Sequence, residues 1–173
     1  MSIVNKFAFP WPCFGLVIVV LVGILSGCRS TKPKAYNLEV MLDEKLGTKS
    51  VEVNIVGINE LEKSNWEQLA VDDYWGSKFY EDANKVVMKF GQGQPLSQKV
   101  SKKDPVWSTW FASGVNHLFM VGDIPGVLSS QPGASDPRVL ILPLSKDCWK
   151  DKTIKIEINP SQVRPLSPIQ CTE

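Results

Sequence analysis

Apolar and polar side chains alternate along several segments of this chain, and this pattern constrains its fold more than any other feature. In residues 36–42, 51–57 and 153–158, the apolar side chains fall on every second position. Successive side chains of a strand point to opposite faces of a sheet, so this spacing is typical of half-buried antiparallel strands. Residues 117–122 and 138–142 are apolar on both faces, which favours two central strands.

Shorter segments complete the expected set of elements. Residues 85–90 and, more weakly, 98–102 are further strand candidates. Helical patterns are few: residues 59–69 and 105–112 each predict a short helix, and residues 79–84 predict a single turn. Short strands separated by turn signals predict a mainly β fold, an antiparallel two-sheet β-sandwich with one or two short helices. A small open barrel is the alternative.

The N-terminal segment differs in composition from the rest of the chain. Residues 1–27 contain one charged side chain, Lys6, and the run from Cys13 to Leu25 is 13 residues without a polar interruption. A membrane-spanning helix needs about 20 apolar residues, whereas the core of an export signal needs about 7–15. The segment therefore predicts a signal peptide. The alternative is an uncleaved anchor over residues 7–27, but two prolines interrupt its first half.

The apolar run ends in the sequence Leu25-Ser26-Gly27-Cys28. This sequence resembles the bacterial lipobox, whose Leu and two small residues are recognised by the lipoprotein signal peptidase. The resemblance implies cleavage before Cys28, a diacylglycerol on its sulfur and a further acyl chain, such as palmitate, on the new amino terminus. Two signals of this kind hold a protein stably on a membrane. Arg29, in place of Asp, implies the outer membrane, with the protein facing the periplasm, rather than the inner membrane.

Cleavage would leave residues 28–173, a length of 146 residues that suits one domain with a real core. We expect a lipidated tether at 28–35, a β-sandwich domain at 36–160 and a C-terminal tail at 161–173. Without Lys6, 18 basic residues balance 18 acidic ones, so the formal net charge is zero. A nucleic-acid partner is disfavoured, because such surfaces show a clustered basic excess.

The cysteines become informative once export is assumed. Cys13 leaves with the signal peptide and Cys28 carries lipid, so Cys148 and Cys171 remain. An oxidising compartment favours their pairing, and a bridge across 23 residues would stabilise the fold by about 3 kcal/mol. Two free thiols are the alternative.

Catalytic and metal-binding patterns are weak in this sequence. His117 is the single histidine, and there is neither a Gly-x-Ser-x-Gly elbow nor a zinc-ligand spacing around it. We interpret His117 as a sheet residue with a satisfied ring nitrogen. Asp72-Asp73 and Glu81-Asp82 lack the alternating pattern of a calcium loop and predict a solvated acidic surface. We therefore expect no enzyme activity, no metal and no cofactor.

The aromatic residues are the better candidates for recognition. Burial is expected for three of the five tryptophans that follow the signal segment, Trp66, Trp107 and Trp149. Trp75 and Tyr74 stand beside Asp72 and Asp73 in a polar loop, so these four are candidate partner-binding residues. The first hypothesis is a non-catalytic lipoprotein that docks a protein partner through residues 59–76. The alternative is a surface module that binds glycan or peptidoglycan through exposed aromatic rings.

The order of elements carries a second resemblance. A strand at 51–58, a loop with a short helix, a strand at 117–123 and a tryptophan just before the final strand at 153–158 follow one another. This layout resembles the small outer-membrane lipoprotein of type VI secretion systems and covers most of residues 36–160. The resemblance implies a transthyretin-like β-sandwich that docks the periplasmic part of a trans-envelope protein, with 59–76 corresponding to the partner-binding loop. The Asn-rich and Pro-x-Pro-Val segment of that family is missing here.

Overall fold

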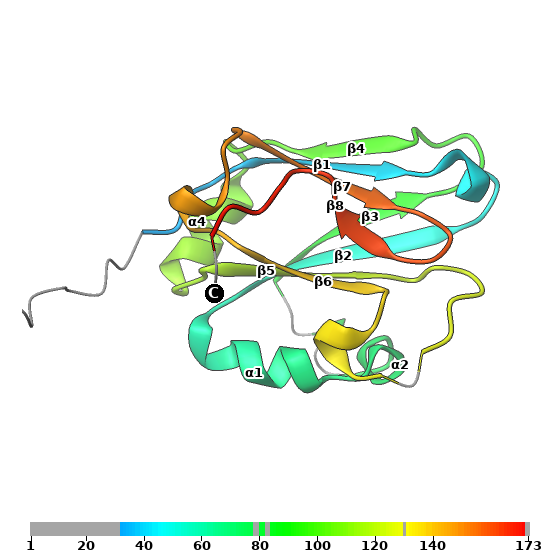
Figure 1. Cartoon of the computed structure of the whole chain (residues 1–173), viewed down its shortest axis with the longest axis horizontal. Helices are drawn as coiled ribbons and strands as arrows, with labels where there is room; N and C mark the ends of the chain where they lie inside the picture. The colour runs from blue at the N-terminus through cyan, green and yellow to red at the C-terminus, as the bar shows by residue number, and fades with distance from the viewer. Residues whose placement is uncertain (1–31, 78–79, 82–83, 130, 172–173) are drawn as a thin grey trace, which may run out of the picture. The chain divides into compact units, whose positions relative to one another are not determined.

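Two four-stranded sheets face each other across an apolar core (Figure 1). The computed structural model describes residues 32–77, 80–81, 84–129 and 131–171, so the predicted signal peptide and the Leu25-Ser26-Gly27-Cys28 motif lie outside the described residues. The described strands are β1 (Asn37–Leu42), β2 (Val51–Ile58), β3 (Lys85–Phe90), β4 (Ser97–Val100), β5 (His117–Gly122), β6 (Val139–Pro143), β7 (Thr153–Ile158) and β8 (Val163–Pro165). The helices are α1 (Glu60–Gln68), α2 (Val71–Tyr74) and α4 (Pro105–Ala112), with 3₁₀ turns η1 (Glu44–Leu46), η2 (Gly133–Ser135) and η3 (Lys146–Cys148).

The first sheet has the strand order β4-β1-β7-β8, and the second has the order β3-β2-β5-β6. All neighbouring strands of the second sheet are antiparallel. In the first sheet β1 and β7 are parallel, with Asn37 opposite Thr153 and Leu42 opposite Ile158. The expectation of a purely antiparallel sandwich is therefore wrong at this pair. More than 100 residues separate β1 from β7, so no tight turn forces them to run in opposite directions.

The apolar residues that alternate in the sequence are the ones that lie on the inner faces of the two sheets. Leu38 and Val40 of β1 are fully buried between the sheets, together with Ile154 and Ile156 of the neighbouring β7. Val53 of β2 is fully buried from the opposite sheet. The two-sheet sandwich predicted from the sequence is confirmed.

A third layer, formed by α1 and α2, covers the outer face of the second sheet (Figure 1). Beneath it, Val56 of β2, Phe119 and Val121 of β5 and Val139 of β6 form a separate apolar cluster with side chains from the helices. This second cluster explains why β5 is apolar on both faces: one face packs in the sandwich and the other packs under the helices.

Two tryptophans of α4 close one end of the sandwich. The indoles of Trp107 and Trp110 pack edge to face with ring centroids 5.2 Å apart. A side chain on Gly57 would place its Cβ 2.7 Å from Trp110 Cγ, so the absence of a side chain makes room for this indole. Trp110 Nε1 donates to the carbonyl of Asn84 at 2.9 Å. The burial expected for Trp66, Trp107 and Trp149 is confirmed, with exposures of 6, 2 and 6%.

The ends of the domain are more structured than the sequence predicts. Residues 163–165, assigned to the tail, form β8 and pair with β7. Lys34, assigned to the tether, donates its backbone N–H to the carbonyl of Leu144 at 2.9 Å. Cys148 and Cys171 form a disulfide with an S–S distance of 2.05 Å, the pairing expected from the sequence. In the part of the chain that the structure describes, no helix is long and apolar enough to cross a bilayer.

Candidate partner-binding surface

The helical layer, residues 59–77, begins with a doubly capped helix. Asn59 Oδ1 accepts from the Glu62 N–H at 3.0 Å, and Glu62 Oε2 accepts from the Asn59 N–H at 3.3 Å. Asn116 Nδ2, just before β5, donates to Glu60 Oε2 at 3.3 Å. His117 is 8% exposed, and its Nδ1 lies 2.9 Å from Asn116 Oδ1, as expected for a satisfied sheet histidine. These contacts fix the start of α1 against the start of β5.

Aromatic rings attach the layer to the second sheet. Trp66 is the buried residue of α1, and its ring centroid lies 4.8 Å from that of Phe119 on β5. Tyr74 of α2 is fully buried, 6.2 Å from the Phe119 ring and 5.1 Å from the Trp75 ring. Each such aromatic pair adds about 0.5–1.5 kcal/mol beyond its buried area. The layer is therefore a packed part of the fold.

A buried arginine connects α2 to the start of β6. Arg138 is 7% exposed, and its Nε and Nη2 donate to the two carboxylate oxygens of the fully buried Asp136 at 3.0 and 2.8 Å. Its Nη1 donates to Asp72 Oδ1 at 2.9 Å. The hydrogen bonds from Arg138 to Asp136 raise the pKa of the guanidinium group above its ordinary value. We call Arg138, Asp136 and Asp72 the arginine clamp.

A glycine lets the segment before β6 approach the end of α1. Gly133 donates its backbone N–H to the carbonyl of Leu69 at 2.9 Å. Its φ is +45°, and a Cβ there would lie 1.7 Å from the carbonyl oxygen of Glu67. Only glycine fits this contact, which places the arginine clamp next to α2.

The outward side of the layer is acidic and carries one exposed leucine. Residues 59–77 contain five acidic side chains and one basic side chain, Lys63. Leu61 is 89% exposed, and Asp73 is exposed on α2. We call the outward-facing residues the acidic face: Glu60, Leu61, Glu62, Glu67, Asp72 and Asp73.

The structure separates the four partner-binding candidates taken from the sequence. Asp73 is exposed, and Asp72 is exposed but bound to Arg138. Tyr74 is fully buried, so the expectation that its ring is available at the surface is wrong. Trp75 is half-buried with its Nε1 inside, so it is not the exposed ring that the sequence predicts. Tyr74 and Trp75 are anchoring residues because the second sheet offers an apolar outer face for them to cover.

Leu61 is not among the binding candidates taken from the sequence, although its position in the helix predicts that its side chain is exposed. It lies five residues before Trp66, and five residues turn a helix by about 500°, which places the two side chains roughly 140° apart. Since Trp66 is the buried residue of α1, Leu61 is directed away from the sheet.

Among the described residues, no cluster of three or more His, Cys, Asp or Glu side chains is arranged to hold a metal ion.

Among the described residues, three buried polar atoms under the layer have no hydrogen-bond partner: Asn54 Oδ1, the Tyr74 hydroxyl and Trp75 Nε1. Burial raises the pKa of Tyr74 well above its ordinary value of 10.0. The polar side chain of Asn54 beside the hydroxyl lowers this pKa and so opposes the shift. The contact falls outside hydrogen-bond geometry, and both Asn54 Oδ1 and the Tyr74 hydroxyl lack a partner. Buried groups in this condition carry a desolvation penalty of about 1–3 kcal/mol.

Replacing Tyr74 with phenylalanine is therefore expected to leave stability unchanged or to raise it by about 1 kcal/mol. Because the folded-state pKa is raised, the contribution of Tyr74 to stability is complete below about pH 10 and is lost as the pH rises further. Urea unfolding at pH 8 and pH 10.5 should show a smaller alkaline loss in Tyr74→Phe. At pH 8, Tyr36→Phe is the control, because the Tyr36 hydroxyl donates to the Ser145 carbonyl at 3.1 Å and its removal should destabilise. A loss of stability at pH 8 in Tyr74→Phe as large as that in Tyr36→Phe would contradict this account.

A fold similar to that of this domain is also found in solved structures. No protein-family model and no curated protein matches the sequence. A solved structure described as a type VI membrane complex is similar over 78% of this chain and 99% of that chain, with a TM-score of 0.52 at 14% identity. Serratia marcescens Lip, a membrane bound component of the Type VI Secretion System, has a TM-score of 0.49 at 10% identity over 80% of this chain and 100% of that chain. A type VI secretion lipoprotein from Pseudomonas aeruginosa has a TM-score of 0.45 at 8% identity over 81% of this chain and 100% of that chain. The likeness to the chain from the type VI membrane complex supports the fold that the order of elements predicts.

Proposed function

We propose that this chain is a lipid-anchored envelope protein that binds a protein partner through its acidic face, in an assembly of the type VI secretion kind. The Leu25-Ser26-Gly27-Cys28 motif supports the anchor, on the periplasmic side of the outer membrane. The observation that carries the docking role is Leu61, 89% exposed among carboxylates on a helix that the fold holds rigidly. The role is non-catalytic: the domain presents a surface rather than a reactive centre.

The acidic face is organised before any partner arrives. Capping fixes the start of α1, Trp66 fixes its middle, and the arginine clamp fixes α2. Binding then orders few side chains, so little of the interaction energy is lost to conformational entropy. An apolar contact inside a charged rim is the usual layout of a protein interface. The partner surface that fits is basic, with an apolar recess for Leu61.

Asp73 lies far from the tether along the sandwich. The arginine clamp is at the start of β6, and β6 runs five residues to Pro143, beside the Leu144 carbonyl that accepts from Lys34. A strand of that length spans about 17 Å. With the chain anchored through Cys28, α2 is therefore on the part of the domain away from the membrane, where a partner reaches it.

Replacing an apolar and an acidic side chain of the acidic face by basic ones should strongly weaken docking. We expect Leu61→Arg with Asp73→Lys to weaken partner recovery from detergent-solubilised membranes about tenfold or more, since centrally placed interface residues dominate binding energy. Both side chains are exposed, so the thermal midpoint should stay unchanged. Leu128→Arg with Asp123→Lys is the matched control, because it makes the same charge change on exposed residues outside the helical layer. If the two double variants recover the partner equally well, docking does not use the acidic face.

The anchor is tested in the same cells. Cys28→Ser should leave the signal peptide attached and abolish acylation, which intact mass and radiolabelled palmitate incorporation both report. A Cys28→Ser chain with the mass and labelling of the unaltered protein would overturn the anchor without bearing on the acidic face.

A further inference from the structure

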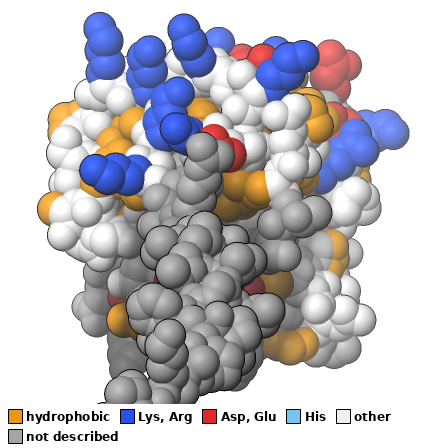
Figure 2. Space-filling view, turned by 60° about the vertical axis from the view of Figure 1, so that its left-hand side comes forward, with side chains coloured by type: hydrophobic (Ala, Val, Ile, Leu, Met, Phe, Trp, Pro, Cys, Tyr) orange, Lys and Arg blue, Asp and Glu red, His pale blue; other side chains and the backbone are white. Residues whose placement is uncertain are grey.

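Seven exposed lysines gather at the end of the domain where the chain enters it. They come from four separate segments: Lys32, Lys34, Lys102, Lys103, Lys146, Lys150 and Lys152. We call them the lysine end. In Figure 2, where this side of the molecule comes forward, lysine and arginine side chains line its upper part.

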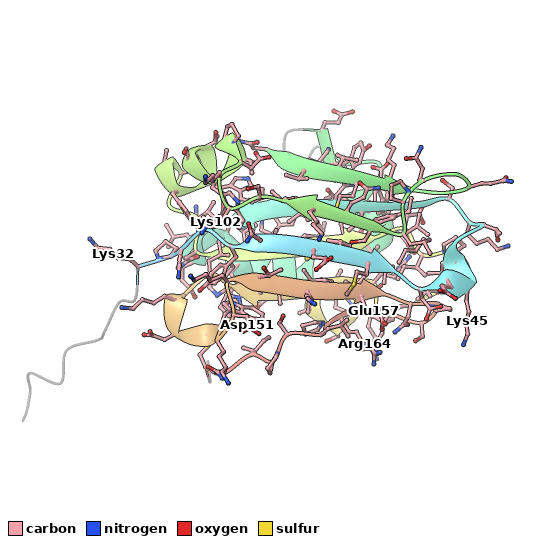
Figure 3. The ribbon with its side chains drawn as sticks, turned by 90° about the horizontal axis from the view of Figure 1, so that it is seen from above. Lys32, Lys45, Lys102, Asp151, Glu157 and Arg164 are labelled. Atoms are coloured by element: carbon pink, nitrogen blue, oxygen red, sulfur yellow. A yellow bond between two sulfur atoms is a disulfide. The ribbon has the colours of Figure 1, made fainter. Side chains whose placement is uncertain are left out.

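Backbone contacts bring these segments together. The N–H of Asn37 donates to the carbonyl of Lys152 at 3.1 Å, and the N–H of Lys102 donates to Asn37 Oδ1 at 2.9 Å. The N–H of Lys34 donates to the Leu144 carbonyl, two residues before Lys146. Seen from above, Lys32 and Lys102 lie at one end of the first sheet, whereas Lys45 lies at the other (Figure 3).

The positive charge of this end is not neutralised by the fold. Three acidic residues accompany the seven lysines there: Asp104, Asp147 and Asp151. Within the described ranges, none of the seven ammonium groups forms a salt bridge, although Lys89 and Lys99 elsewhere pair with Glu52 and Glu39 at 3.4 and 3.0 Å. Counted over the described residues, the excess is about four positive charges, on a chain whose net charge after the proposed cleavage is zero.

An open groove of about 670 Å³ lies within this end, beside the start of β7. Three lysines and one carboxylate residue line it, together with a hydroxyl: Lys150, Lys152, Lys155, Asp151 and Ser167. Ammonium groups around a hollow of this kind are suited to phosphate oxygens.

We infer that the lysine end binds an anionic phospholipid surface, the membrane to which the chain is anchored. The inference rests on the proposed lipid at Cys28. Lys32 is four positions after Cys28, and a chain of that length spans at most about 14 Å when extended. Attraction between exposed charges reaches about 8 Å at physiological ionic strength. The short tether therefore holds the lysine end near the lipid headgroups and lets it come within this range, whereas a free anionic polymer has no such proximity.

This contact orients the domain. With the lysine end on the bilayer, the strands run away from the membrane and carry α2 to the opposite end. The same anionic surface repels Asp72 and Asp73 and favours this orientation. Lipid contact at one end thus holds α2, with Asp72 and Asp73, away from the membrane, where a partner can reach it.

The test measures lysine reactivity in the full acylated chain, reconstituted into vesicles of phosphatidylcholine alone or with 30% phosphatidylglycerol added. Acetylation by an N-hydroxysuccinimide ester, followed by mass spectrometry, reports each lysine separately. We expect Lys150 and Lys152 to react about fivefold more slowly in the anionic vesicles, and 0.5 M NaCl to remove the difference. Lys45 and Lys49, at the other end, should react equally in both vesicles.

Charge variants assign the protection to the lysine end. Lys102→Glu with Lys103→Glu should abolish the protection of Lys150 and Lys152, whereas Lys45→Glu with Lys49→Glu should retain it. Equal reactivity in both vesicles, for protein that floats with them, overturns the lipid-binding surface and leaves the anchor standing. If the purified protein carries no lipid acyl chain and fails to float with the vesicles, the anchor is overturned and this inference with it.

Discussion

Replacing Arg138 with alanine is expected to lower the free energy of unfolding by about 3–5 kcal/mol. Asp136 is fully buried, and both of its carboxylate oxygens accept from Arg138. Removing the guanidinium leaves that carboxylate without a counter-charge in a low-dielectric environment. Equilibrium urea unfolding of the variant and the unaltered chain measures the difference.

Two further variants separate the buried contact from the exposed one. Asp72 is 73% exposed, so Asp72→Asn should lower stability by less than about 1 kcal/mol. Combining Arg138→Met with Asp136→Leu removes both buried charges and should restore most of the stability lost by Arg138→Ala. A loss in Arg138→Ala no larger than that in Asp72→Asn would contradict a buried charge pair.

The same variants connect stability to binding. Arg138 bonds Asp72 of α2 to the start of β6, so its loss removes one of the contacts that position Asp72 and Asp73. Asp72→Asn should disturb the acidic face slightly, whereas Arg138→Ala should weaken partner recovery even at temperatures where the domain remains folded. The arginine clamp thus acts on docking by positioning α2.

The inner faces of the sheets were predictable because period-two alternation is a local property. Val51, Val53 and Ile55 of β2 identify their own face without knowledge of the partner strand. By contrast, β8 is three residues long and ends in Pro165, so no local pattern marks it. It forms because the turn after β7, closed by Asn159 N–H donating to the Gln162 carbonyl at 3.0 Å, returns the chain to pair with β7.

The candidate site was harder to predict, because which of its side chains are buried depends on contacts between segments that are distant in the sequence. Asn54 alternates outward as predicted, yet it is fully buried because the helical layer covers that face. Tyr74 follows two aspartates and resembles a surface residue until Phe119 of β5 packs against it. Asp136 stands two residues before Arg138 and hints at the pair, whereas the contact with Asp72 spans 66 residues and leaves no local signal.

Removing the disulfide is expected to lower the free energy of unfolding by about 3 kcal/mol, from the loop entropy that the bridge removes from the unfolded chain. Cys148 and Cys171 are 23 residues apart, and the intervening segment contains β7 and β8. Near the bridge, Gln170 N–H donates to the Cys148 carbonyl at 2.9 Å. The end of the chain is therefore held to η3 by a covalent bond and a hydrogen bond.

The double variant Cys148→Ser with Cys171→Ser isolates this contribution. Its unfolding midpoint should fall and should not respond to dithiothreitol, whereas the unaltered chain in dithiothreitol should fall to a similar value. Hydrogen exchange should rise first around residues 163–171 and only later in β2 and β5, because the sandwich core does not depend on the bridge. A chain kept in a reducing compartment should behave like the double variant. Equal midpoints for oxidised and reduced protein would show that the bridge adds nothing to the fold.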